Sequence, residues 1–465
     1  MKRSGLLLAC VAILCYTACY SQASGNKKVV FKNVNVVTME KEGVLSGQDV
    51  LTENGKIVSL KKSGAKYGND VIVVDGSGKY LMPGLAEMHG HVPPVDDLQP
   101  MKEVMQLFAA HGITTVRGML GHPKHLELRR MLNSGEFVGP RFITSGPSIS
   151  GSTVKTPEEG AAKVRDQKKA GYDFLKIHPG LTLENFNAVA STAKEVNIPF
   201  AGHVSFHVGV WKAIDAKQQT IDHLDAFVEG IVPGIENIPE DQVGLFGIFV
   251  ADRADVSRLP SLVQALKKNN VWVVPTQALA ERWMTPARDA ESFRNDPEMK
   301  YMDQKTIDNW VNVKNGLLND SRYDSAKVAQ YIGLRRKMIF ECNKAGVGLL
   351  LGCDAPQIFN VPGISTHHEL QYLVDAGLTP YEALKTGTAN VGRFLGKPGQ
   401  IGVIKAGAFS DLILVNGNPL EDISNTKKIE GVMVGKTWMS RADLDATLNK
   451  LEKSETPQST TFLAK

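Results

Sequence analysis

The stretch LMPGLAEMHGHV, residues 81–92, carries the clearest structural signal in the sequence. Its apolar part, Leu81 to Ala86, predicts a short buried strand that delivers His89 and His91 to the carboxyl end of the strand. Side chains two positions apart on a strand point the same way, so both imidazoles are expected to face one site. Two histidines supply half of a tetrahedral zinc site, although the same pair could also be polar loop residues.

Strand-like apolar runs alternate with helical patterns between residues 82 and 395. After the opening strand, the runs are 112–119, 141–146, 173–178, 200–204, 220–227, 271–277 and 347–354. Helical patterns lie between most of them, for example where Thr156 and Glu159 fit a capping box and Gly171 fits a helix end. Strands that alternate with helices over this length are typical of a (β/α)8 barrel, or TIM barrel, which needs about 250 residues. We therefore expect an α/β protein with a barrel over residues 82–395.

Residues of the metal-ligand type stand at the carboxyl ends of these predicted strands, where such barrels carry their chemistry. They are His89, His91, Lys176, His203, His223 and Asp354. Each one alone has a simple explanation, because a histidine at a strand end can be a polar core residue and an aspartate there can cap the next helix. Their coincidence at the ends of several strands favours a metal site.

The two ends of the sequence share one pattern, in which short predicted strands are separated by turns. The first strands include the dipeptide Asn54-Gly55, which is typical of a hairpin turn. A β unit of about fifty residues buries little surface by itself. We therefore expect residues 24–81 and 396–445 to form one small composite β-sandwich domain. Residues 446–465 are expected to be a tail, in which 451–465 form a frayed helix end followed by disorder.

The first residues have the pattern of a targeting segment. Lys2 and Arg3 precede an apolar stretch, 5–18, that is too short to be a spanning helix. We expect residues 1–23 to be a signal peptide and the protein to be exported to the periplasm or the extracellular space. Cleavage before Ser24 fits this pattern, and the alternative is a lipobox that makes Cys19 a lipidated N-terminus.

The composition excludes some partners. With 43% hydrophobic and 22% charged residues the chain is typical of a soluble globular protein, and a net charge of +4 gives no basis for a nucleic-acid or membrane-surface partner. Of the five cysteines, Cys342 and Cys353 remain after the leader, so no disulfide framework is expected. The oligomeric state stays open.

Several segments together resemble the amidohydrolase superfamily, in its branch of imidazolonepropionase-like and Xaa-Pro dipeptidase-like (prolidase-like) metal hydrolases. The segments are PGLAEMHGH, GITTVR, GPRFITSG, DFLKIH, AGHV, IDHL, LLLGCDAP, HHELQYLVDAGLTPYEALKTGTAN and GVIKAGAFSDLILVNGNPLEDI. They cover most of residues 79–423. The combination is specific for the superfamily and says far less about the substrate.

The resemblance implies a centre with two zinc ions per chain. Lys176 would bridge the ions as a carbamate, because a lysine ammonium has no acceptor with which to bind a cation. If Lys176 is unmodified, a mononuclear site is expected instead. The implied ligands are His89, His91 and Asp354 for the more buried ion, and His203 and His223 for the second.

The resemblance also implies a mechanism. A metal lowers the pKa of bound water from 15.7 to about 7, which provides a hydroxide that attacks a carbonyl. Asp354 would be the general base and then the general acid for the departing amine. The expected activity is hydrolysis of amide C–N bonds in dipeptides and other small peptides, N-acyl compounds or cyclic amides. Two alternatives stay open: a lactonase, esterase or organophosphate hydrolase with the same centre, and a non-catalytic periplasmic binding protein.

Further residues are candidates for contact with a small-molecule or dipeptide substrate. His178 shares a strand face with Lys176, and His207 follows His203 closely, so either could touch the substrate. The long segments 228–260 and 280–335 are expected to cover the active face as lids. Arginines in the second segment could pair with a substrate carboxylate.

Overall fold

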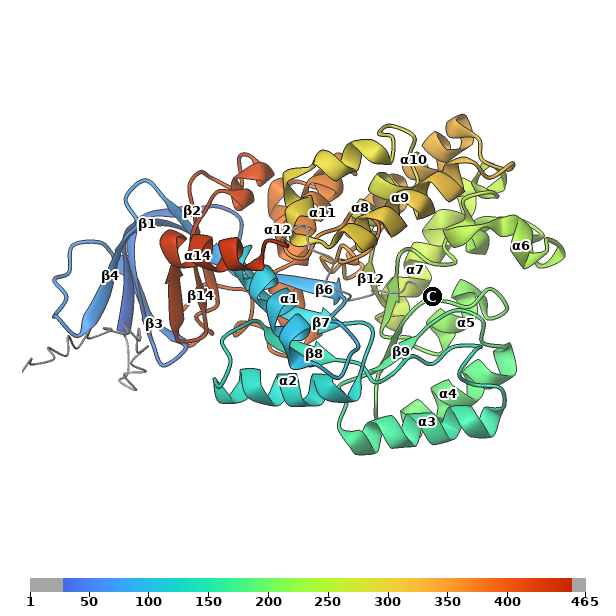
Figure 1. Ribbon diagram of the computed structural model, residues 1–465, viewed down its shortest axis with the longest axis horizontal. Coiled ribbons are helices and arrows are strands. Elements are labelled where there is room, and N and C mark those ends of the chain that lie inside the picture. Colours follow the sequence, from blue (N-terminus) through green and yellow to red (C-terminus); the bar gives the residue numbers. More distant parts are fainter. Residues whose placement is uncertain (1–27, 454–465) are drawn as a thin grey trace, which may run out of the picture.

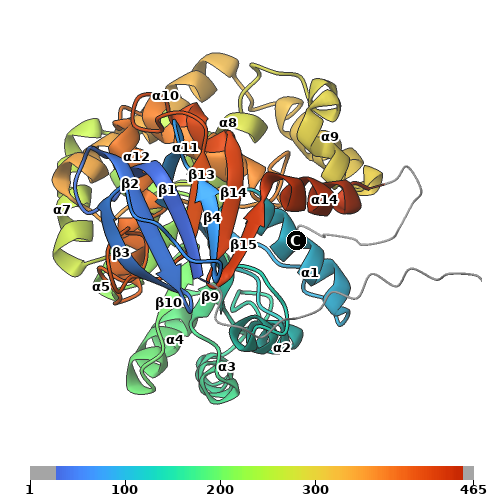
Figure 2. The same cartoon turned by 90° about the vertical axis from the view of Figure 1, so that its left-hand side faces the viewer.

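A computed structural model of the chain describes residues 28–453, and both ends of this range contribute to one sheet (Figures 1 and 2). The sheet has eight strands in the order β15-β14-β13-β5-β1-β2-β3, with β4 paired to β1. The strands are β1 Lys28–Val37, β2 Val44–Glu53, β3 Lys56–Lys62, β4 Val71–Asp75, β5 Tyr80–Pro83, β13 Leu412–Val415, β14 Ile429–Val434 and β15 Thr437–Ser440. Strands from 28–83 and from 412–440 thus share one sheet, whereas a β-sandwich would have two. The predicted leader 1–23, Cys19 and residues 454–465 lie outside the described residues.

The turn between β2 and β3 is the one that the sequence predicts. Asn54 and Gly55 both have positive φ, 53° and 76°, which a two-residue turn of type I′ requires. On one face of the sheet, Phe31, Val50 and Leu414 are buried in a common apolar cluster. Burial of this cluster is what holds strands from opposite ends of the sequence together.

Parallel strands build the remaining sheets. β6 Leu85–Gly90, β7 Ile113–Gly118 and β8 Arg141–Thr144 form one, and β9 Leu175–Ile177, β10 Phe200–Gly202, β11 Thr220–Asp222 and β12 Trp272–Val274 form the other. All neighbours within them are parallel. A parallel bridge between Ser145 and Phe174 links the two sheets. The class is therefore α/β, and the parallel strands from β7 to β12 lie where apolar runs predict them.

The first predicted strand differs in detail from the structure. Leu81 belongs to β5 in the composite sheet, whereas Leu85 begins β6 in the parallel sheet. The chain changes sheets at Gly84, whose amide donates to Asp411 O at 2.8 Å. A Cβ at Gly84 would lie 2.2 Å from Thr114 Oγ1, so only glycine fits this crossing. Both strands are apolar and buried, which is why the sequence shows them as one run.

The last predicted strand, 347–354, is reduced to a bridge between Leu349 and Val273. Hydrogen bonds nevertheless hold this segment on both sides. Leu350 N donates to Val273 O at 2.9 Å, and Met88 N donates to Leu351 O at 2.8 Å. The segment therefore lies between β12 and β6.

Helices cover the parallel sheets and the edge of the composite sheet (Figure 1). They are α1 Leu98–Ala110, α2 Pro123–Ser134, α3 Pro157–Ala170, α4 Leu183–Glu195, α5 Gly209–Asp215, α6 Glu240–Val243, α7 Leu259–Asn269, α8 Gln277–Trp283, α9 Gln304–Leu318, α10 Ser325–Ala345, α11 Ile364–Asp375, α12 Pro380–Thr386, α13 Ala389–Phe394 and α14 Arg441–Leu451. Within residues 28–453, no helix is both long enough and apolar enough to cross a membrane.

Local details at two helices refine the predictions. At α3, Thr156 Oγ1 accepts from Glu159 N at 3.3 Å, but the Glu159 carboxylate accepts from Lys155 N rather than closing a capping box. Gly171 ends this helix in the left-handed conformation, as expected. At the other end of the chain, α14 is regular to Leu451 and packs against α1 (Figure 2). Residues 446–451 of the predicted tail thus belong to α14, which ends at Leu451 where the sequence predicts a frayed helix end.

Two long segments lie near the carboxyl ends of the parallel strands. Residues 228–260 contain short 3-10 helices and α6, among them Glu229–Ile231, Ile235–Asn237 and Leu245–Gly247. Residues 280–335 contain α9 and the start of α10. The arginines predicted to pair with substrate in this second segment already have acidic partners. Arg282 and Arg288 bind Asp296, Arg294 binds Asp308, and Arg322 binds Asp320.

Candidate active site

The central group of the site is a buried triad of possible metal ligands. His91 Nε2 lies 2.6 Å from Asp354 Oδ1, and His89 Nε2 lies 3.4 Å from the same oxygen. One ligand atom of each residue lies within 4.8 Å of the others. His89 stands on β6, and Asp354 follows the segment that lies beside β6. Two imidazole nitrogens and a carboxylate oxygen suit a divalent cation such as Zn²⁺.

Lys176 adjoins this triad. It stands on β9 with 0% of its surface exposed, and its Nζ lies 3.3 Å from His89 Nε2. Burial lowers the pKa of the Lys176 ammonium to about 8. Gly202 on β10 makes room for the side chain, since a Cβ there would lie 2.8 Å from Lys176 Cδ.

His203 and His223 complete the group from the next two strands. Their ring centroids are 4.5 Å apart, and that of His223 is 4.4 Å from the ring of His89. His203 Nδ1 lies 3.0 Å from Asp225 Oδ2, and His223 Nδ1 lies 2.9 Å from Thr276 Oγ1. These contacts leave the Nε2 atom of each ring for a ligand. The structure therefore brings together the six residues that the sequence singles out.

Burial keeps the imidazoles in the form that can bind a metal. It is the first cause that holds the pKa values of His89, His203 and His223 well below the ordinary value, and neighbouring positive charges add to it. A neutral imidazole has a free lone pair, whereas an imidazolium has none. The donor set thus fits a metal, with His89 and His91 nearest Asp354 and His203 beside His223, and the lowered pKa values of His89, His203 and His223 favour neutral rings.

The backbone is unusual at the same place. His223 and Asp354 have positive φ, 63° and 64°, which is uncommon for residues other than glycine. Thr276, the hydrogen-bond partner of His223, also lies in the left-handed region, with φ 46°. Such conformations cost free energy and tend to persist where they position functional groups.

The two residues expected to touch substrate occupy different places. The His178 ring stacks on His203, with centroids 5.2 Å apart, and its Nδ1 lies 2.6 Å from Ser148 Oγ. Burial and the charge of Lys176 lower the pKa of His178 far below its ordinary value. His207 is 63% exposed at its side chain and lies 3.5 Å from Glu240. His178 thus borders the ligand group, and His207 lines the cavity that opens beside His203.

Several supporting residues escaped the sequence analysis. Asp222 Oδ2 lies 2.8 Å from His89 Nδ1, although the two atoms are not aligned as a hydrogen bond. Arg117 donates to Asp222 at 3.2 Å and to Met88 O at 2.7 Å. Arg335 donates to His223 O at 2.7 Å. Asp222 lies in the motif IDHL and Arg117 in the motif GITTVR, so the sequence contained a signal for both. No motif in the sequence marks Arg335.

A second group of supporting contacts surrounds Glu87. Its carboxylate accepts from the backbone amides of His89 and Cys353, each at 3.0 Å. It also accepts from Thr366 Oγ1 at 2.8 Å. Glu87 therefore ties the end of β6 to the backbone just before Asp354.

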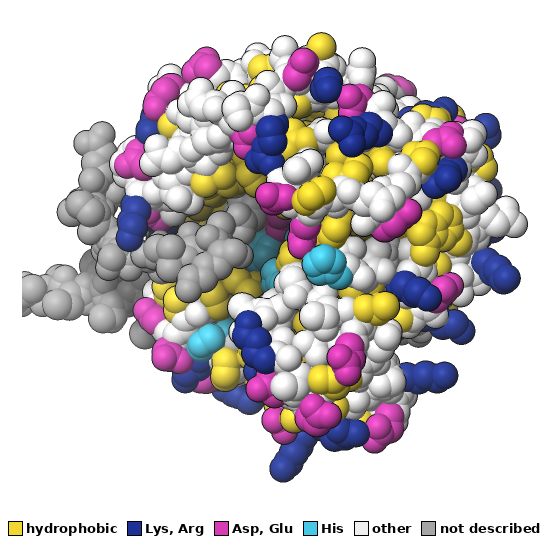
Figure 3. All heavy atoms as spheres, turned by 90° about the vertical axis from the view of Figure 1, so that its right-hand side faces the viewer, with side chains coloured by type: hydrophobic (Ala, Val, Ile, Leu, Met, Phe, Trp, Pro, Cys, Tyr) yellow, Lys and Arg dark blue, Asp and Glu magenta, His cyan; other side chains and the backbone are white. Residues whose placement is uncertain are grey.

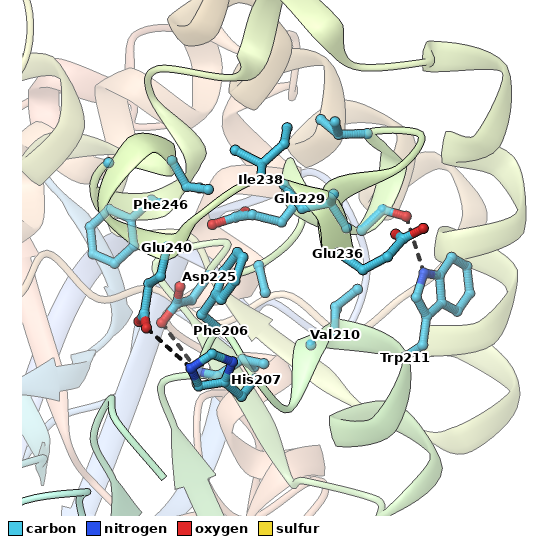
Figure 4. A pocket seen from close by; sticks show the side chains of 18 of the residues that line it. Phe206, His207, Val210, Trp211, Asp225, Glu229, Glu236, Ile238, Glu240 and Phe246 are labelled. Atoms are coloured by element: carbon cyan, nitrogen blue, oxygen red, sulfur yellow. Dashed lines mark hydrogen bonds and ion pairs between the residues drawn. The ribbon is translucent and has the colours of Figure 1, made fainter. Parts of the chain in front are cut away.

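A cavity of about 1000 Å³ opens beside His203 and Asp225, under the 228–250 part of the first long segment (Figure 4). The face of the molecule shown in Figure 3 is hollowed, with histidine side chains beside the hollow. The buried polar cluster, the adjoining cavity and the parallel strands define a class of protein: an α/β protein with a metal-type site at the carboxyl ends of its strands.

Comparison with known proteins identifies the family. The model of the Amidohydrolase family matches residues 80–439, and the chain belongs to this family. The chain is therefore an enzyme, and the predicted resemblance is confirmed. Ochratoxinase from Aspergillus niger is 24% identical over 382 residues, which cover 74% of this chain and 71% of the fungal protein.

Solved structures share the fold. A proposed prolidase from Bifidobacterium longum superposes with a TM-score of 0.67 at 22% identity, over 91% of this chain and 99% of that one. The bottromycin amidohydrolase AH superposes with a TM-score of 0.69 at 20% identity, over 91% and 89%. At these identities the likeness concerns the fold alone.

Proposed function

We propose that the protein is a metal-dependent hydrolase of amide bonds in small peptides, N-acyl compounds or cyclic amides. One observation carries the proposal: His89, His91 and Asp354 place two nitrogens and an oxygen within 4.8 Å of one another inside a family of amidohydrolases. The names of the relatives, an ochratoxinase and a proposed prolidase, support amides as the substrate class.

We also propose that the parallel strands close into a (β/α)8 barrel. The two parallel sheets would close into a barrel if they were joined at both of their edges. Backbone hydrogen bonds at both edges support this closure. Asp173 N donates to Thr144 O at 3.0 Å between β8 and β9, and the segment 347–352 bonds to β12 and to β6. A closed barrel would make the strand ends converge on one site.

The chemistry divides between the metal and the protein. A metal, when bound, supplies an activated water and polarises the scissile carbonyl. We expect Asp354 to hold the proton; in support of this role, its Oδ1 lies beside both His91 and His89, and its Oδ2 lies 4.0 Å from His223 Nδ1. Its carboxylate would take the proton from the water and return it to the departing amine.

Lys176 has the environment required for conversion to a carbamate. A lowered pKa of about 8 leaves part of its amine neutral near physiological pH, and the neutral amine is the form that attacks CO₂. In this reaction a nitrogen–carbon bond forms and the nitrogen loses a proton. The product has two oxygens and a negative charge, so it could bridge two Zn²⁺ ions in a place where the ammonium could bind none.

The first test measures metal content. We expect about two Zn²⁺ per chain when the protein is loaded with zinc and bicarbonate, and one or none in Lys176→Ala. The exposed lysine Lys194 provides the matched control, because Lys194→Ala removes the same atoms from the surface of α4. Equal metal content in wild type and Lys176→Ala would remove Lys176 from the site.

The second test measures turnover. We expect hydrolysis of some members of a panel of dipeptides, N-acyl amino acids and cyclic amides, and almost complete loss of it in Asp354→Asn with most of the metal retained. Faster hydrolysis of lactones, aryl esters or organophosphates would assign the enzyme to the alternative substrate class. Full turnover in Asp354→Asn would place the proton-transfer group elsewhere.

We propose export as well, on the basis of the leader pattern in residues 1–23. The N-terminal mass of the secreted protein distinguishes cleavage before Ser24 from a lipidated Cys19. A protein that retains Met1 in the cytoplasm would contradict export.

A further inference from the structure

The cavity beside the candidate active site has a floor made partly of the ligand group itself. His203 and Asp225 line it, and Asp225 accepts from His203 Nδ1. Phe246 also lines it, and its ring stacks on His223 at 5.2 Å between centroids and on His203 at 6.2 Å. A molecule in this cavity would therefore lie directly beside the site at which an amide bond would be cleaved.

The walls of the cavity are apolar over much of their area. Val210, Phe206 and Ile238 project into it, with Phe246 at one end and Trp211 at the other (Figure 4). Such walls favour an alkyl chain, because burial of each CH₂ group contributes about 0.8 kcal/mol. The cavity is long enough to contact more of a substrate than the scissile bond alone.

The lining of the cavity is rich in acidic side chains, and burial raises the pKa of Glu229 to about 8, so this carboxyl is mostly neutral at pH 7 until a cation binds beside it. Asp225 and Glu229 lie inside the cavity, and Glu236 and Glu240 lie on its exposed rim. The basic lining residue Arg258 is exposed and lies 3.6 Å from Asp255, while Glu240 has His207 as its partner. The deeper carboxylates therefore have no cation among the described lining residues.

Among the acidic residues that line the cavity, Glu229 has a buried oxygen atom, Oε2, without a hydrogen-bond partner in the described part of the chain. Gly247 leaves room for this oxygen, since a Cβ there would lie 2.9 Å from it. In Figure 4 the carboxylate turns toward the end of the cavity where Phe246 and Asp225 lie. The buried cation in this region, Arg335, donates to His223 O, Pro275 O and Gln277 Oε1 rather than to Glu229.

Ionisation of Glu229 is costly while its Oε2 has no hydrogen-bond partner, and a ligand that supplies a cation with N–H donors offsets this cost. An apolar wall with an acid at its inner end fits a side chain that combines a methylene stem with a charged tip. Lysine and arginine side chains have this form.

We propose that this cavity selects substrates with a lysine-like or arginine-like group next to the scissile amide, and that Glu229 binds its ammonium or guanidinium. This inference rests on the proposed amide hydrolysis and names the substrate class of the same site. Asp225 lies in the same cavity, and the apolar walls would contact the methylene stem. Glu236 and Glu240, exposed to water, contribute less because solvent screens them.

The test uses pairs of dipeptides that differ only in charge: Ala-Lys against Ala-norleucine, and Lys-Ala against norleucine-Ala. In one of these two pairs we expect kcat/KM to be about 10- to 100-fold higher for the dipeptide with lysine than for the dipeptide with norleucine. This is the range that a hydrogen bond to a charged group supplies. In Glu229→Gln the ratio should collapse toward one. Glu184→Gln, on the exposed surface of α4, is the matched control and should keep the wild-type ratio.

Two results would overturn the inference. The first is equal kcat/KM for lysine and norleucine members in both orientations, and the second is a lysine preference that survives in Glu229→Gln. Hydrolysis of the norleucine dipeptides tests the proposed function separately, because it needs no charge recognition. If they are hydrolysed without a lysine preference, only the inference about Glu229 fails.

A binding measurement keeps the inference testable if no dipeptide is hydrolysed. Calorimetry with the full chain should give tighter binding of L-lysine than of L-norleucine, and Glu229→Gln should remove the difference. Equal binding of the two amino acids by the wild type would contradict a cation site whether or not the enzyme turns over a peptide.

Discussion

Asp222 Oδ2 lies 2.8 Å from His89 Nδ1, and both side chains are almost completely buried, with 0% and 1% exposed. The other nitrogen of His89, Nε2, faces Asp354 and Lys176. Arg117 lies behind Asp222 and donates to it at 3.2 Å. A carboxylate beside the far nitrogen of a ligating histidine makes the ring a stronger ligand, and the approach of Asp222 is an ion-pair contact of this kind rather than an aligned hydrogen bond.

The first prediction concerns Asp222→Asn. This change removes the charge next to His89 and leaves Arg117 buried without its partner. We expect metal affinity to fall roughly 10- to 100-fold, and the free energy of unfolding to fall by about 3 to 5 kcal/mol. Competition with a chelator measures the first quantity and urea unfolding of the metal-free protein measures the second. Asp166→Asn, on the exposed surface of α3, is the control. Unchanged affinity in Asp222→Asn would mean that Asp222 does not strengthen His89 as a ligand.

The second prediction concerns Glu87, which accepts hydrogen bonds from the amides of His89 and Cys353 and from Thr366. In Glu87→Gln one acceptor oxygen becomes an NH₂ group that faces other donors. We expect the free energy of unfolding to fall by about 1 to 3 kcal/mol, because a buried donor is left unsatisfied. Urea unfolding checks this value against Glu184→Gln. A stability equal to that of the control would show that the buried carboxylate is replaceable.

The third prediction concerns the space that Gly202 leaves for Lys176. Gly202 has φ 120°, and a Cβ there would lie 2.5 Å from Ile177 O, a backbone atom that cannot move aside cheaply. We expect Gly202→Ala to destabilise the protein by more than about 1 kcal/mol, and to reduce metal binding by displacing Lys176. Gly333 in α10 is the matched control, since a Cβ there meets nothing within 4 Å. Gly333→Ala should raise stability by about 0.5 to 1 kcal/mol. A neutral Gly202→Ala would contradict the close packing of β9 and β10.

The residues of the candidate site could be predicted from sequence because each follows an apolar run, and strand ends in a parallel α/β fold converge. His89 and His203 are examples: each ends a short buried strand, and the strand count places them on one side. Their partners could not be predicted in this way. Asp222 and Arg117 are far from His89 in sequence. The contacts of Asp222 with His89 and of Arg117 with Asp222 depend on the register between strands, which apolar periodicity does not reveal.

The same reasoning explains where the fold prediction was less accurate. The strands on either side of Gly84 are both buried and apolar, so hydrophobicity alone could not show that the chain passes from one sheet to another there. The sequence did not show that arginines of segment 280–335 have acidic partners within the protein, because residues close in space can be several positions apart in the chain. Asp296 pairs with both Arg282 and Arg288, and this only becomes visible once the segment is folded.

The last prediction concerns the pH dependence of stability in metal-free protein kept in buffer depleted of CO₂. Burial lowers the pKa of Lys176 from its ordinary value of 10.5 to about 8. Between these two pH values the folded protein has released the Lys176 proton while the unfolded chain still carries it. The unfolded state therefore binds more protons, and the contribution of Lys176 to the free energy of unfolding rises as pH increases from about 8 to 10.5.

Lys176→Met isolates this contribution, because methionine has a similar length and no charge. The difference in the free energy of unfolding between wild type and Lys176→Met should shift in favour of wild type as the pH rises through this window, and below it the difference should stay constant. Lys194→Met, at an exposed position of α4, should run parallel to wild type throughout. If Lys176→Met also runs parallel to wild type, then Lys176 keeps its ordinary pKa in the folded protein. In that case too little neutral amine would be present near physiological pH to react with CO₂, and the proposed carbamate would lose its chemical basis.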